Sequence, residues 1–245
     1  MDLQKSYYNL NNILTYNRFL TMIVGGRGTG KSYAVKKMII KNFIKKKEEF
    51  VYIRRTKVEL EKAATPEFFK DIANEFPDTE FYIKGERIYI NGEVAGYFIP
   101  LSGQAKYKSV PYPNVKTIFF DEFIDFKGRY LKNEIFTFLE LISTIVRDRD
   151  DVRCILCGNN VSIINPYYTY FNVRPTGNRN IIVSKTNPEV ILEIVNNTPQ
   201  MNNRLKNSKF GKFIEGTTYG EYNINNKALN DNDNFILKDK PLDSK

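Results

Sequence analysis

The sequence predicts an α/β fold with a mainly parallel central sheet and helices on both faces. Two observations predict it. Apolar runs of strand length alternate with longer amphipathic segments along most of the chain, which is the pattern of a sheet built from β–α units. The chain has 245 residues, of which 42% are hydrophobic and 27% are charged, so it is long and apolar enough to bury a sizeable core.

The first half of the chain supplies the first strands and helices. Residues 1–18 are polar and predict an N-terminal arm. Leu20–Val24 is an apolar run that ends in glycines, and Phe50–Arg54 is the next such run, so both predict strands. In Lys31–Lys46 the apolar residues recur on one helix face, and Pro66–Phe76 begins with a proline suited to a first helical turn. Both segments predict helices.

A small insertion follows these elements. The short apolar segments Glu80–Ile83, Arg87–Ile90 and Val94–Pro100 are separated by turn signals at Gly85 and Gly92. They predict a small β-meander inserted into the α/β body.

The second half resumes the alternation. Thr117–Phe120, Val152–Cys157 and Ile181–Ser184 are apolar runs that predict strands. Leu131–Val146 carries one apolar stripe and predicts a helix, and Asn187–Asn197 opens with Asn-Pro and predicts another.

The end of the chain has a different composition. Residues 196–245 contain 11 asparagines and few aliphatic clusters, so we expect a linker or an extended tail there. We therefore expect one domain over residues 1–195.

The composition excludes several kinds of chemistry. The chain has no histidine, which rules out Ser-His-Asp and Cys-His hydrolases and histidine-ligated zinc. Its two cysteines, Cys154 and Cys157, lie on one predicted strand at an odd offset, so their thiols should point to opposite faces as core residues. No apolar run approaches the roughly 18 residues that cross a bilayer.

The positive charge is concentrated at one end of the chain. The net charge is +9, and residues 1–60 account for all of it, with 13 Lys and Arg against 4 Asp and Glu. Much of the excess lies in the run Lys36–Lys47. A basic face would suit a polyanionic partner, and a solvated helix in a lysine-rich sequence explains the run equally well.

The segment between the first strand and the first helix carries the strongest functional signal. It fits the pattern G-x-x-x-x-G-K-[ST], in which glycines let a loop wrap around phosphates and the following helix adds its positive end. In this pattern Lys31 reaches the β- and γ-phosphates of ATP and Ser32 holds Mg²⁺. Arg27 is a further candidate for the γ-phosphate or for a neighbouring subunit. The expected nucleotide-binding residues are Gly25, Gly26, Arg27, Gly28, Thr29, Gly30, Lys31 and Ser32.

A pair of acids follows the strand Thr117–Phe120. Such an apolar strand with an acid at its end is the Walker B pattern, in which Asp121 would hold Mg²⁺, usually through water. Glu122, one residue on, is placed to polarise an attacking water, which favours hydrolysis over transfer of phosphate to a metabolite. The sequence has no Asn-Lys-x-Asp segment, which disfavours a GTPase.

Polar residues at other element ends complete the candidate set. Asn159 follows a strand, where its amide would orient the attacking water or hold Glu122. Arg147 and Arg149 end the longest helix of the second half, and an arginine delivered from there to a neighbouring γ-phosphate would assist catalysis. A solvated helix end is the alternative for this arginine pair.

In combination, these segments resemble the DNA-packaging (encapsidation) ATPases of small tailed bacteriophages with terminal-protein-capped genomes. Those proteins belong to the additional-strand, catalytic-glutamate branch of P-loop NTPases, the RecA/terminase-like type. The segments that carry the resemblance are Gly25–Ser32, Tyr52–Lys57, Ile118–Glu122, Arg147–Arg149 and Leu156–Asn160.

The resemblance implies a motor that hydrolyses ATP with Mg²⁺ and drives double-stranded DNA into a preformed capsid. It implies a homo-oligomeric ring, thought to be pentameric, in the host cytoplasm and transiently at the portal vertex of the procapsid, with a structural RNA as a further partner and no membrane. Arg147 or Arg149 would act on a neighbour's nucleotide, Asn159 would sense the γ-phosphate, and Lys57 would act across the subunit interface. The residues expected to contact DNA are Lys127, Arg129, Lys106 and Lys108.

Two other functions stay open on the sequence alone. One is a different P-loop enzyme, either helicase-like or a small-molecule kinase. The other is a nucleotide-gated scaffold that does not hydrolyse ATP. The resemblance also implies a C-terminal, nuclease-like domain, which we do not expect within residues 196–245.

Overall fold

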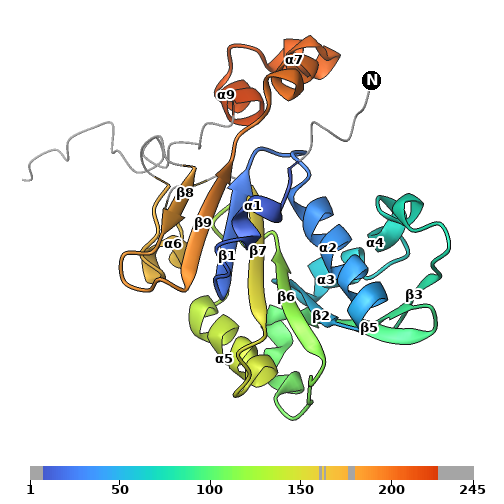
Figure 1. Cartoon of the computed structure of the whole chain (residues 1–245). Coiled ribbons are helices and arrows are strands. Elements are labelled where there is room, and N and C mark those ends of the chain that lie inside the picture. Colours follow the sequence, from blue (N-terminus) through green and yellow to red (C-terminus); the bar gives the residue numbers. More distant parts are fainter. Residues whose placement is uncertain (1–7, 160–161, 163, 176–179, 226–245) are drawn as a thin grey trace, which may run out of the picture.

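The computed structural model describes residues 8–159, 162, 164–175 and 180–225 (Figure 1). A twisted central sheet runs through the molecule, with helices on both of its faces. This arrangement confirms the α/β fold that the sequence predicts.

The sheet of the described residues has nine strands in the order β3-β4-β5-β2-β6-β7-β1-β9-β8. The six strands β5, β2, β6, β7, β1 and β9, which are consecutive in this order, pair in parallel. The strands β3, β4 and β8 pair with their neighbours in antiparallel fashion. The predicted meander is therefore β3–β5, at one edge of the sheet. The strands are β1 (Leu20–Gly25), β2 (Glu49–Arg54), β3 (Phe81–Lys84), β4 (Arg87–Ile90), β5 (Glu93–Pro100), β6 (Val115–Asp121), β7 (Arg153–Asn159), β8 (Ile181–Val183) and β9 (Val190–Val195).

Helices connect the strands and extend beyond the last of them. The α-helices of the described residues are α1 (Asn11–Leu14), α2 (Lys31–Lys46), α3 (Lys57–Ala63), α4 (Glu67–Lys70), α5 (Glu134–Val146), α6 (Pro166–Tyr170), α7 (Pro199–Asn207), α8 (Lys209–Ile214) and α9 (Thr218–Asn225). Two 3₁₀ segments are η2 (Ala73–Glu75) and η3 (Leu101–Tyr107). Within the described residues, no helix is long and apolar enough to span a membrane.

The core has two layers because the central strands are buried on both faces. Along β6, Ile118 and Phe120 pack in the layer that contains α5, and Phe119 packs in the layer that contains α2. The two cysteines divide in the same way, with Cys154 in the α5 layer and Cys157 in the α2 layer. The prediction that their thiols face opposite sides is confirmed.

Two predicted helices are wrong or incomplete. Asn187–Asn197 contains the strand β9, because the β-branched run from Val190 to Val195 pairs in parallel with β1. Pro66–Phe76 forms only the short helix α4 and the 3₁₀ turn η2. The helix α3 was missed, although Thr56 and Glu59 form a capping box that could have marked its start.

The segment predicted as a linker or extended tail is helical where the structure describes it. Its helices α7, α8 and α9 pack against one another beyond the end of β9 (Figure 1). Asn197, just before α7, contacts α9, since its side-chain amide donates a 2.9 Å hydrogen bond to the carbonyl oxygen of Ile224. The division of the chain at residue 195 stays a prediction.

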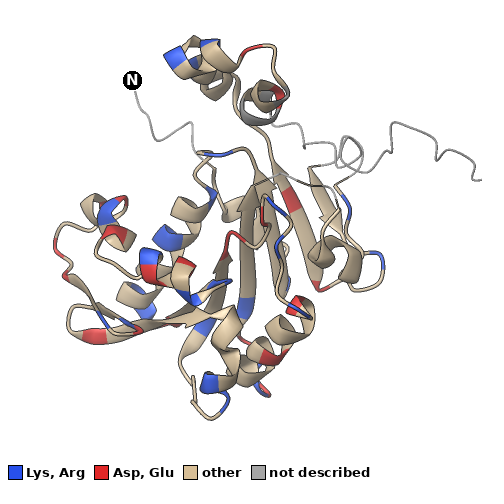
Figure 2. Ribbon diagram, turned by 180° about the vertical axis from the view of Figure 1, so that it is seen from behind, with Lys and Arg blue, Asp and Glu red and all other residues tan. Residues whose placement is uncertain are grey.

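The lysine-rich helix α2 does not present a uniformly basic face. Lys36 pairs with Asp71 at 3.3 Å, Lys37 pairs with Glu75 at 2.5 Å and Lys46 approaches Glu48 at 3.6 Å. Figure 2 shows blue and red segments interspersed around this helix. The local ion pairs favour the solvated-helix explanation of the Lys36–Lys47 run over a polyanion site.

Candidate active site

A hollow of about 240 Å³ lies at the carboxyl edge of the parallel sheet, where β1, β6 and β7 end and α2 begins. Ligands of open α/β sheets bind at this edge. The hollow unites the predicted P-loop, Walker B acids and strand-end amide. Its lining residues are Arg27, Gly28, Thr29, Gly30, Lys31, Ser32, Tyr33, Asp121, Glu122, Cys157, Gly158 and Asn159.

The glycines of the P-loop are required by its backbone. Gly28 and Gly30 have φ angles of 76° and 89°, in the left-handed region that favours glycine. A Cβ atom on Gly25 would lie 2.4 Å from the carbonyl oxygen of Val195 on the paired strand β9. The loop can therefore turn tightly from β1 into α2 with its backbone amides free to face a phosphate group.

The lysine of the loop is turned inward. The Lys31 Nζ atom donates hydrogen bonds to the carbonyl oxygens of Gly25 and Gly26 at 3.2 and 2.7 Å, and to the Thr29 hydroxyl at 3.1 Å. Only 5% of the residue is exposed, and burial lowers the pKa of this ammonium group to about 8. The ammonium group thus occupies the mouth of the loop, where phosphate oxygens would replace its neutral acceptors.

Asp121 is held by three donors from other elements. Its Oδ1 atom accepts a 2.7 Å hydrogen bond from the Ser32 hydroxyl. Its Oδ2 atom accepts one from the Tyr52 hydroxyl at 3.0 Å and lies 3.4 Å from Nη1 of Arg54. The Ser32 and Asp121 oxygens are therefore close enough to share one hard cation such as Mg²⁺, which takes few protein oxygens and completes its shell with phosphates and water.

Glu122 has a strained backbone and a charged partner. Its φ angle is 60°, which is uncommon for a residue with a side chain. Its Oε2 atom accepts a 2.5 Å hydrogen bond from Nη2 of Arg54, while 62% of the side chain is exposed. In this arrangement a guanidinium group neutralises the carboxylate that sequence reasoning designates as the base.

The partners of Arg54 could not be read from the sequence. The strand order places β2 beside β6, with Ile53 opposite Phe120, so the next residue of β2 reaches the acids that end β6. The sequence predicts that Arg54 ends a strand, but it does not show which strand lies beside it.

Asn159 lies where the sequence predicts. It ends β7, lines the hollow and stands opposite Gly25 in the β1–β7 register. It is half-buried, and the part of the chain that the structure describes offers its amide no hydrogen-bond partner. The amide is therefore free to contact a γ-phosphate or a water in the hollow.

Arg147 and Arg149 lie at the opposite, amino-terminal edge of the sheet, far from the hollow of their own chain. The Arg149 guanidinium donates to the carbonyl oxygens of Pro113 and Val115 at 2.8 Å. It also donates to two carbonyl oxygens of the last turn of α5, at 2.7 and 3.3 Å. Arg147 is exposed and has a φ angle of 51° at the C-cap of α5. The Arg149 side chain thus stabilises the fold through these hydrogen bonds, whereas the Arg147 side chain makes none to the described residues.

The cations predicted to contact DNA or a neighbour lie on the surface, and most have acidic partners. Lys106 pairs with Glu86 at 3.0 Å, Lys108 with Glu140 at 3.3 Å and Lys57 with Glu61 at 3.6 Å. These exposed pairs contribute little energy and can open to bind phosphate groups.

The loop between β6 and α5 carries the other two predicted cations. The Asp125 carboxylate accepts hydrogen bonds from the backbone amides of Lys127 and Arg129, both at 2.9 Å, and the Arg129 guanidinium at 3.4 Å. The Lys127 side chain is exposed and has no ionic partner within the described ranges. Asp125 thereby gives this loop a defined shape with one unpaired ammonium group.

Two segments that sequence reasoning left outside the site touch the P-loop. The backbone amide of Tyr8, in the N-terminal arm, donates a 3.0 Å hydrogen bond to the carbonyl oxygen of Thr29. Met201 of α7 is buried, and its methyl carbon lies 3.9 Å from the position that a Cβ atom on Gly28 would take. The arm and the helix α7 therefore contact the P-loop from outside the hollow.

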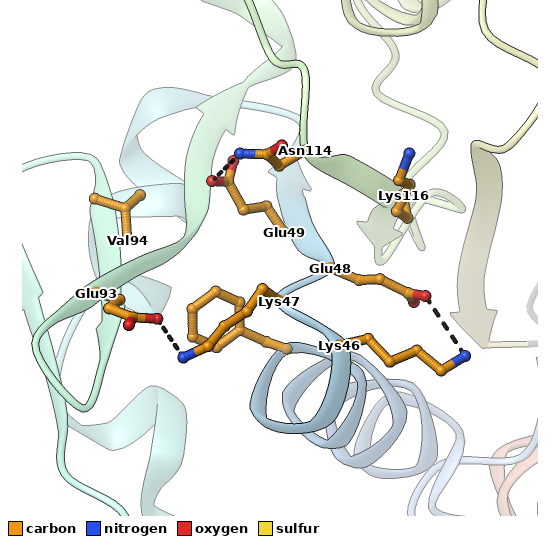
Figure 3. Close-up of a pocket in the computed structure, with 9 residues that line it drawn as sticks. Lys46, Lys47, Glu48, Glu49, Glu93, Val94, Asn114 and Lys116 are labelled. Carbon is orange, nitrogen blue, oxygen red and sulfur yellow. Dashed lines mark hydrogen bonds and ion pairs between the residues drawn. The ribbon is translucent and has the colours of Figure 1, made fainter.

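A larger hollow of about 510 Å³ lies at the amino-terminal edge of the sheet (Figure 3). Its charges are paired across it: Lys47 with Glu93, and Lys46 with Glu48 at 3.6 Å. Because its amines and acids neutralise one another, this hollow lacks the convergent charge of the carboxyl edge.

Comparison with known proteins agrees with this geometry. The family model of the podovirus DNA encapsidation protein (Gp16) matches residues 1–245. The chain belongs to this family. It is 44% identical over 241 residues to the DNA packaging protein of Bacillus phage phi29, covering 98% of this chain and 70% of the relative. A DNA packaging protein of Bacillus phage B103 is 45% identical over 229 residues.

Solved structures of the family have the same fold. The crystal structure of the N-terminal domain of the DNA packaging ATPase from bacteriophage phi29 matches with a TM-score of 0.72 and 44% identity, covering 79% of this chain and 98% of that one. The bacteriophage phi29 genome packaging motor assembly matches with a TM-score of 0.73 and 42% identity, covering 98% of this chain and 72% of that one. The chain is accordingly a phage DNA-packaging ATPase, which decides against the kinase and scaffold alternatives.

Proposed function

We propose that this chain is one subunit of a ring that hydrolyses ATP at the carboxyl edge of its sheet and drives double-stranded DNA through the ring into a capsid. The observation that carries the proposal is the convergence of Lys31, Ser32, Asp121 and Glu122 on one hollow. The oligomeric assembly is supported by the structural match to a packaging motor assembly.

Ser32 and Asp121 would hold Mg²⁺ beside the phosphates. Their oxygens lie 2.7 Å apart, and hard oxygen donors are the ligands this ion prefers. The ion would neutralise phosphate charge that develops during hydrolysis. Lys31 would exchange its three neutral acceptors for the β- and γ-phosphate oxygens, and the backbone amides of the loop would donate to the same groups.

Glu122 would orient and polarise the attacking water. In the described state Arg54 holds its carboxylate at 2.5 Å, so hydrolysis requires that contact to loosen. A cation bound at Asp121 would repel the Arg54 guanidinium, which lies 3.4 Å from the same carboxylate. Asn159 would then contact the γ-phosphate, so that the position of its amide would depend on whether the γ-phosphate is present.

Arg147 would complete the site of a neighbouring subunit. An arginine that acts in trans must be exposed and unpaired. Arg147 is exposed and has no ionic partner among the described residues, whereas Arg149 bonds four carbonyl oxygens. Its position at the edge opposite its own hollow requires contact with a second chain. Such a contribution is worth roughly 10³–10⁵ in rate.

The loop between β6 and α5 would grip DNA in the pore. Lys127 supplies an ammonium group that is unpaired within the described part of the chain, and Arg129 would exchange Asp125 for a phosphate. Lys57, Lys106 and Lys108 are secondary candidates at subunit contacts or on DNA. A portal vertex and a structural RNA are the further partners we propose for the ring, on the family resemblance.

Steady-state ATP turnover as a function of protein concentration tests this function. We expect turnover per subunit to rise with concentration as rings form, and Glu122→Gln to lower it roughly 10²–10⁴-fold while ATP still binds. Glu67→Gln, an exposed glutamate on α4 that pairs with Lys70, is the matched control and should leave turnover unchanged. Turnover that is high and independent of concentration would show that one chain holds a complete site and would overturn the ring mechanism.

A further inference from the structure

A buried ion pair closes the base of the loop that carries Lys127 and Arg129. Where the chain enters the loop, Nη2 of Arg55 donates a 2.5 Å hydrogen bond to the carbonyl oxygen of Phe123. Where the chain leaves it, Oε2 of Glu134 accepts a 2.7 Å hydrogen bond from the backbone amide of Leu131. Arg55 and Glu134 bond each other, so both ends of the loop are fastened to one pair.

The two side chains of this pair make several hydrogen bonds to each other and are buried. Nε of Arg55 lies 2.9 and 3.2 Å from the two carboxylate oxygens of Glu134, and Nη2 lies 3.1 Å from Oε1. The side chains are only 4% and 1% exposed. The Tyr167 hydroxyl donates to Oε1 at 2.8 Å, and the Tyr130 ring lies 5.0 Å from the guanidinium carbon. Four segments therefore meet at one carboxylate–guanidinium pair: the turn after β2, the loop between β6 and α5, α5 itself and α6.

Stability alone is a weak reason for such a pair. Removing two charges from water costs about as much as their attraction returns, and apolar residues of similar volume often serve a core equally well. What apolar residues cannot do is fix the direction of a carbonyl group and an amide group at two ends of a loop. The geometry of the pair therefore points to a positioning role.

The pair also adjoins the catalytic edge. Arg55 follows Arg54, which holds the carboxylate of Glu122, and Nη1 of Arg55 lies 3.4 Å from the carbonyl oxygen of that same glutamate. The strained backbone of Glu122, with its φ angle of 60°, lies between the two arginines. A shift of Glu122 on nucleotide binding would thus move a backbone that Arg55 joins to Glu134 and the loop.

We propose that Arg55 and Glu134 are positioning residues that couple the state of Glu122 to the loop bearing Lys127 and Arg129. The coupling rests on the proposed function, in which Glu122 is the base and this loop contacts DNA. Because the same pair contacts the backbone of Glu122 and both ends of the loop, DNA held at the loop should in turn alter the position of Glu122 and hence hydrolysis.

The test compares turnover with and without double-stranded DNA in the full chain. We expect DNA to change wild-type turnover, and Tyr167→Phe and Glu134→Gln to reduce that change at least ~5-fold, the lower end of common coupling factors, with the KM for ATP unaltered. Tyr97→Phe and Glu49→Gln are matched controls, because they remove the same kind of tyrosine–glutamate bond (3.2 Å) at the opposite edge. They should keep the full DNA effect.

A triple variant separates positioning from stability. Arg55→Met, Glu134→Leu and Tyr167→Phe together replace the pair with apolar volume, which should keep the fold and the thermal midpoint near wild type while abolishing the DNA effect. A variant that melts normally, binds DNA normally and keeps the DNA effect would overturn the proposal, as would wild-type turnover that DNA does not change. A separate experiment tests the proposed catalytic role of Glu122. If Glu122→Gln leaves ATP turnover unchanged, that role is wrong.

Discussion

The Ser32 hydroxyl donates a 2.7 Å hydrogen bond to Asp121, although the two residues lie 89 positions apart in the chain. Ser32 lies in the first turn of α2 and Asp121 ends β6, so the bond joins the P-loop to the Walker B strand across the hollow. Both oxygens are already in place for a shared cation, and binding it requires little rearrangement of either element. This preorganisation lowers the cost of assembling the site.

Removing the Ser32 hydroxyl should therefore weaken the use of Mg²⁺. In Ser32→Ala we expect the Mg²⁺ concentration that gives half-maximal turnover to rise at least ~10-fold, as for loss of a ligand or its orienting partner. Turnover titrated with Mg²⁺ at saturating ATP measures this. Ser109→Ala, which changes an exposed serine outside the lining of the hollow, is the control. An unchanged Mg²⁺ requirement would remove Ser32 from the metal site.

The local signals of this site were readable because each depends on short-range chemistry. The P-loop pattern needs only its glycines, a lysine and a hydroxyl, and Asp121 with Glu122 needs only the end of an apolar strand. The contacts of Arg54 and Arg149 were not readable. Arg54 reaches its acids only because β2 and β6 are neighbours, and Arg149 folds back onto carbonyl oxygens of a different element.

The missed secondary structure has a similar cause. The run from Val190 to Val195 follows an Asn-Pro start that also suits a helix, and its pairing with β1 decides for a strand. Asparagine-rich composition suggested a tail after residue 195, but Met201 and Ile224 supply enough buried apolar contact to hold α7–α9 together. Tertiary packing outweighed weak local preference in both segments.

The buried lysine of the P-loop should make nucleotide binding depend on pH. Burial lowers the pKa of Lys31 from 10.5 to about 8 in the free protein. Bound phosphates would raise it again, because negative charge favours the ammonium form. We therefore expect ATP binding above pH 8 to take up a proton, approaching ~1 per site near pH 9. Calorimetry in buffers of different ionisation enthalpy measures this uptake.

The same shift affects folding in a definite direction. Between pH 8 and 10.5 the unfolded chain keeps the Lys31 proton and the folded chain has lost it, so this group makes stability rise with pH in that window. Below pH 8 the cost of burying the charge is present in full.

The control for the ATP-binding experiment is Lys36→Met, on the same helix but outside the hollow, which should leave the proton uptake intact. If the wild type takes up no proton when it binds ATP at pH 9, the predicted link between the pKa of Lys31 and ATP binding is wrong.

The first glycine of the P-loop should not tolerate a side chain. A Cβ atom on Gly25 would lie 2.4 Å from a backbone oxygen and 2.9 Å from the Cβ atom of Val195, so β1 and β9 would have to separate. We expect Gly25→Ala to lower the free energy of unfolding by roughly 1–3 kcal/mol, as overpacking does, and to abolish ATP binding. Gly103→Ala meets only a side-chain carbon at 3.4 Å and should be tolerated. Thermal midpoints and ATP binding of the two variants decide the matter.

Arg147 and Arg149 should separate cleanly into a catalytic and a structural residue. Arg149→Ala removes four hydrogen bonds to backbone carbonyl oxygens, and we expect it to lower the free energy of unfolding by roughly 2–4 kcal/mol. Arg147→Ala removes an exposed guanidinium, so its thermal midpoint should stay at the wild-type value.

The kinetic outcome of the same pair tests action in trans. Arg147→Ala should bind ATP and assemble, yet lose roughly 10³-fold or more in turnover, because the neighbouring γ-phosphate lacks its arginine. Mixing it with Glu122→Gln should restore activity, since a site built from the intact Glu122 of one chain and the intact Arg147 of the other is complete. Neither variant alone supplies such a site. If the mixture stays inactive while mixed rings form, the arginine does not cross the subunit boundary.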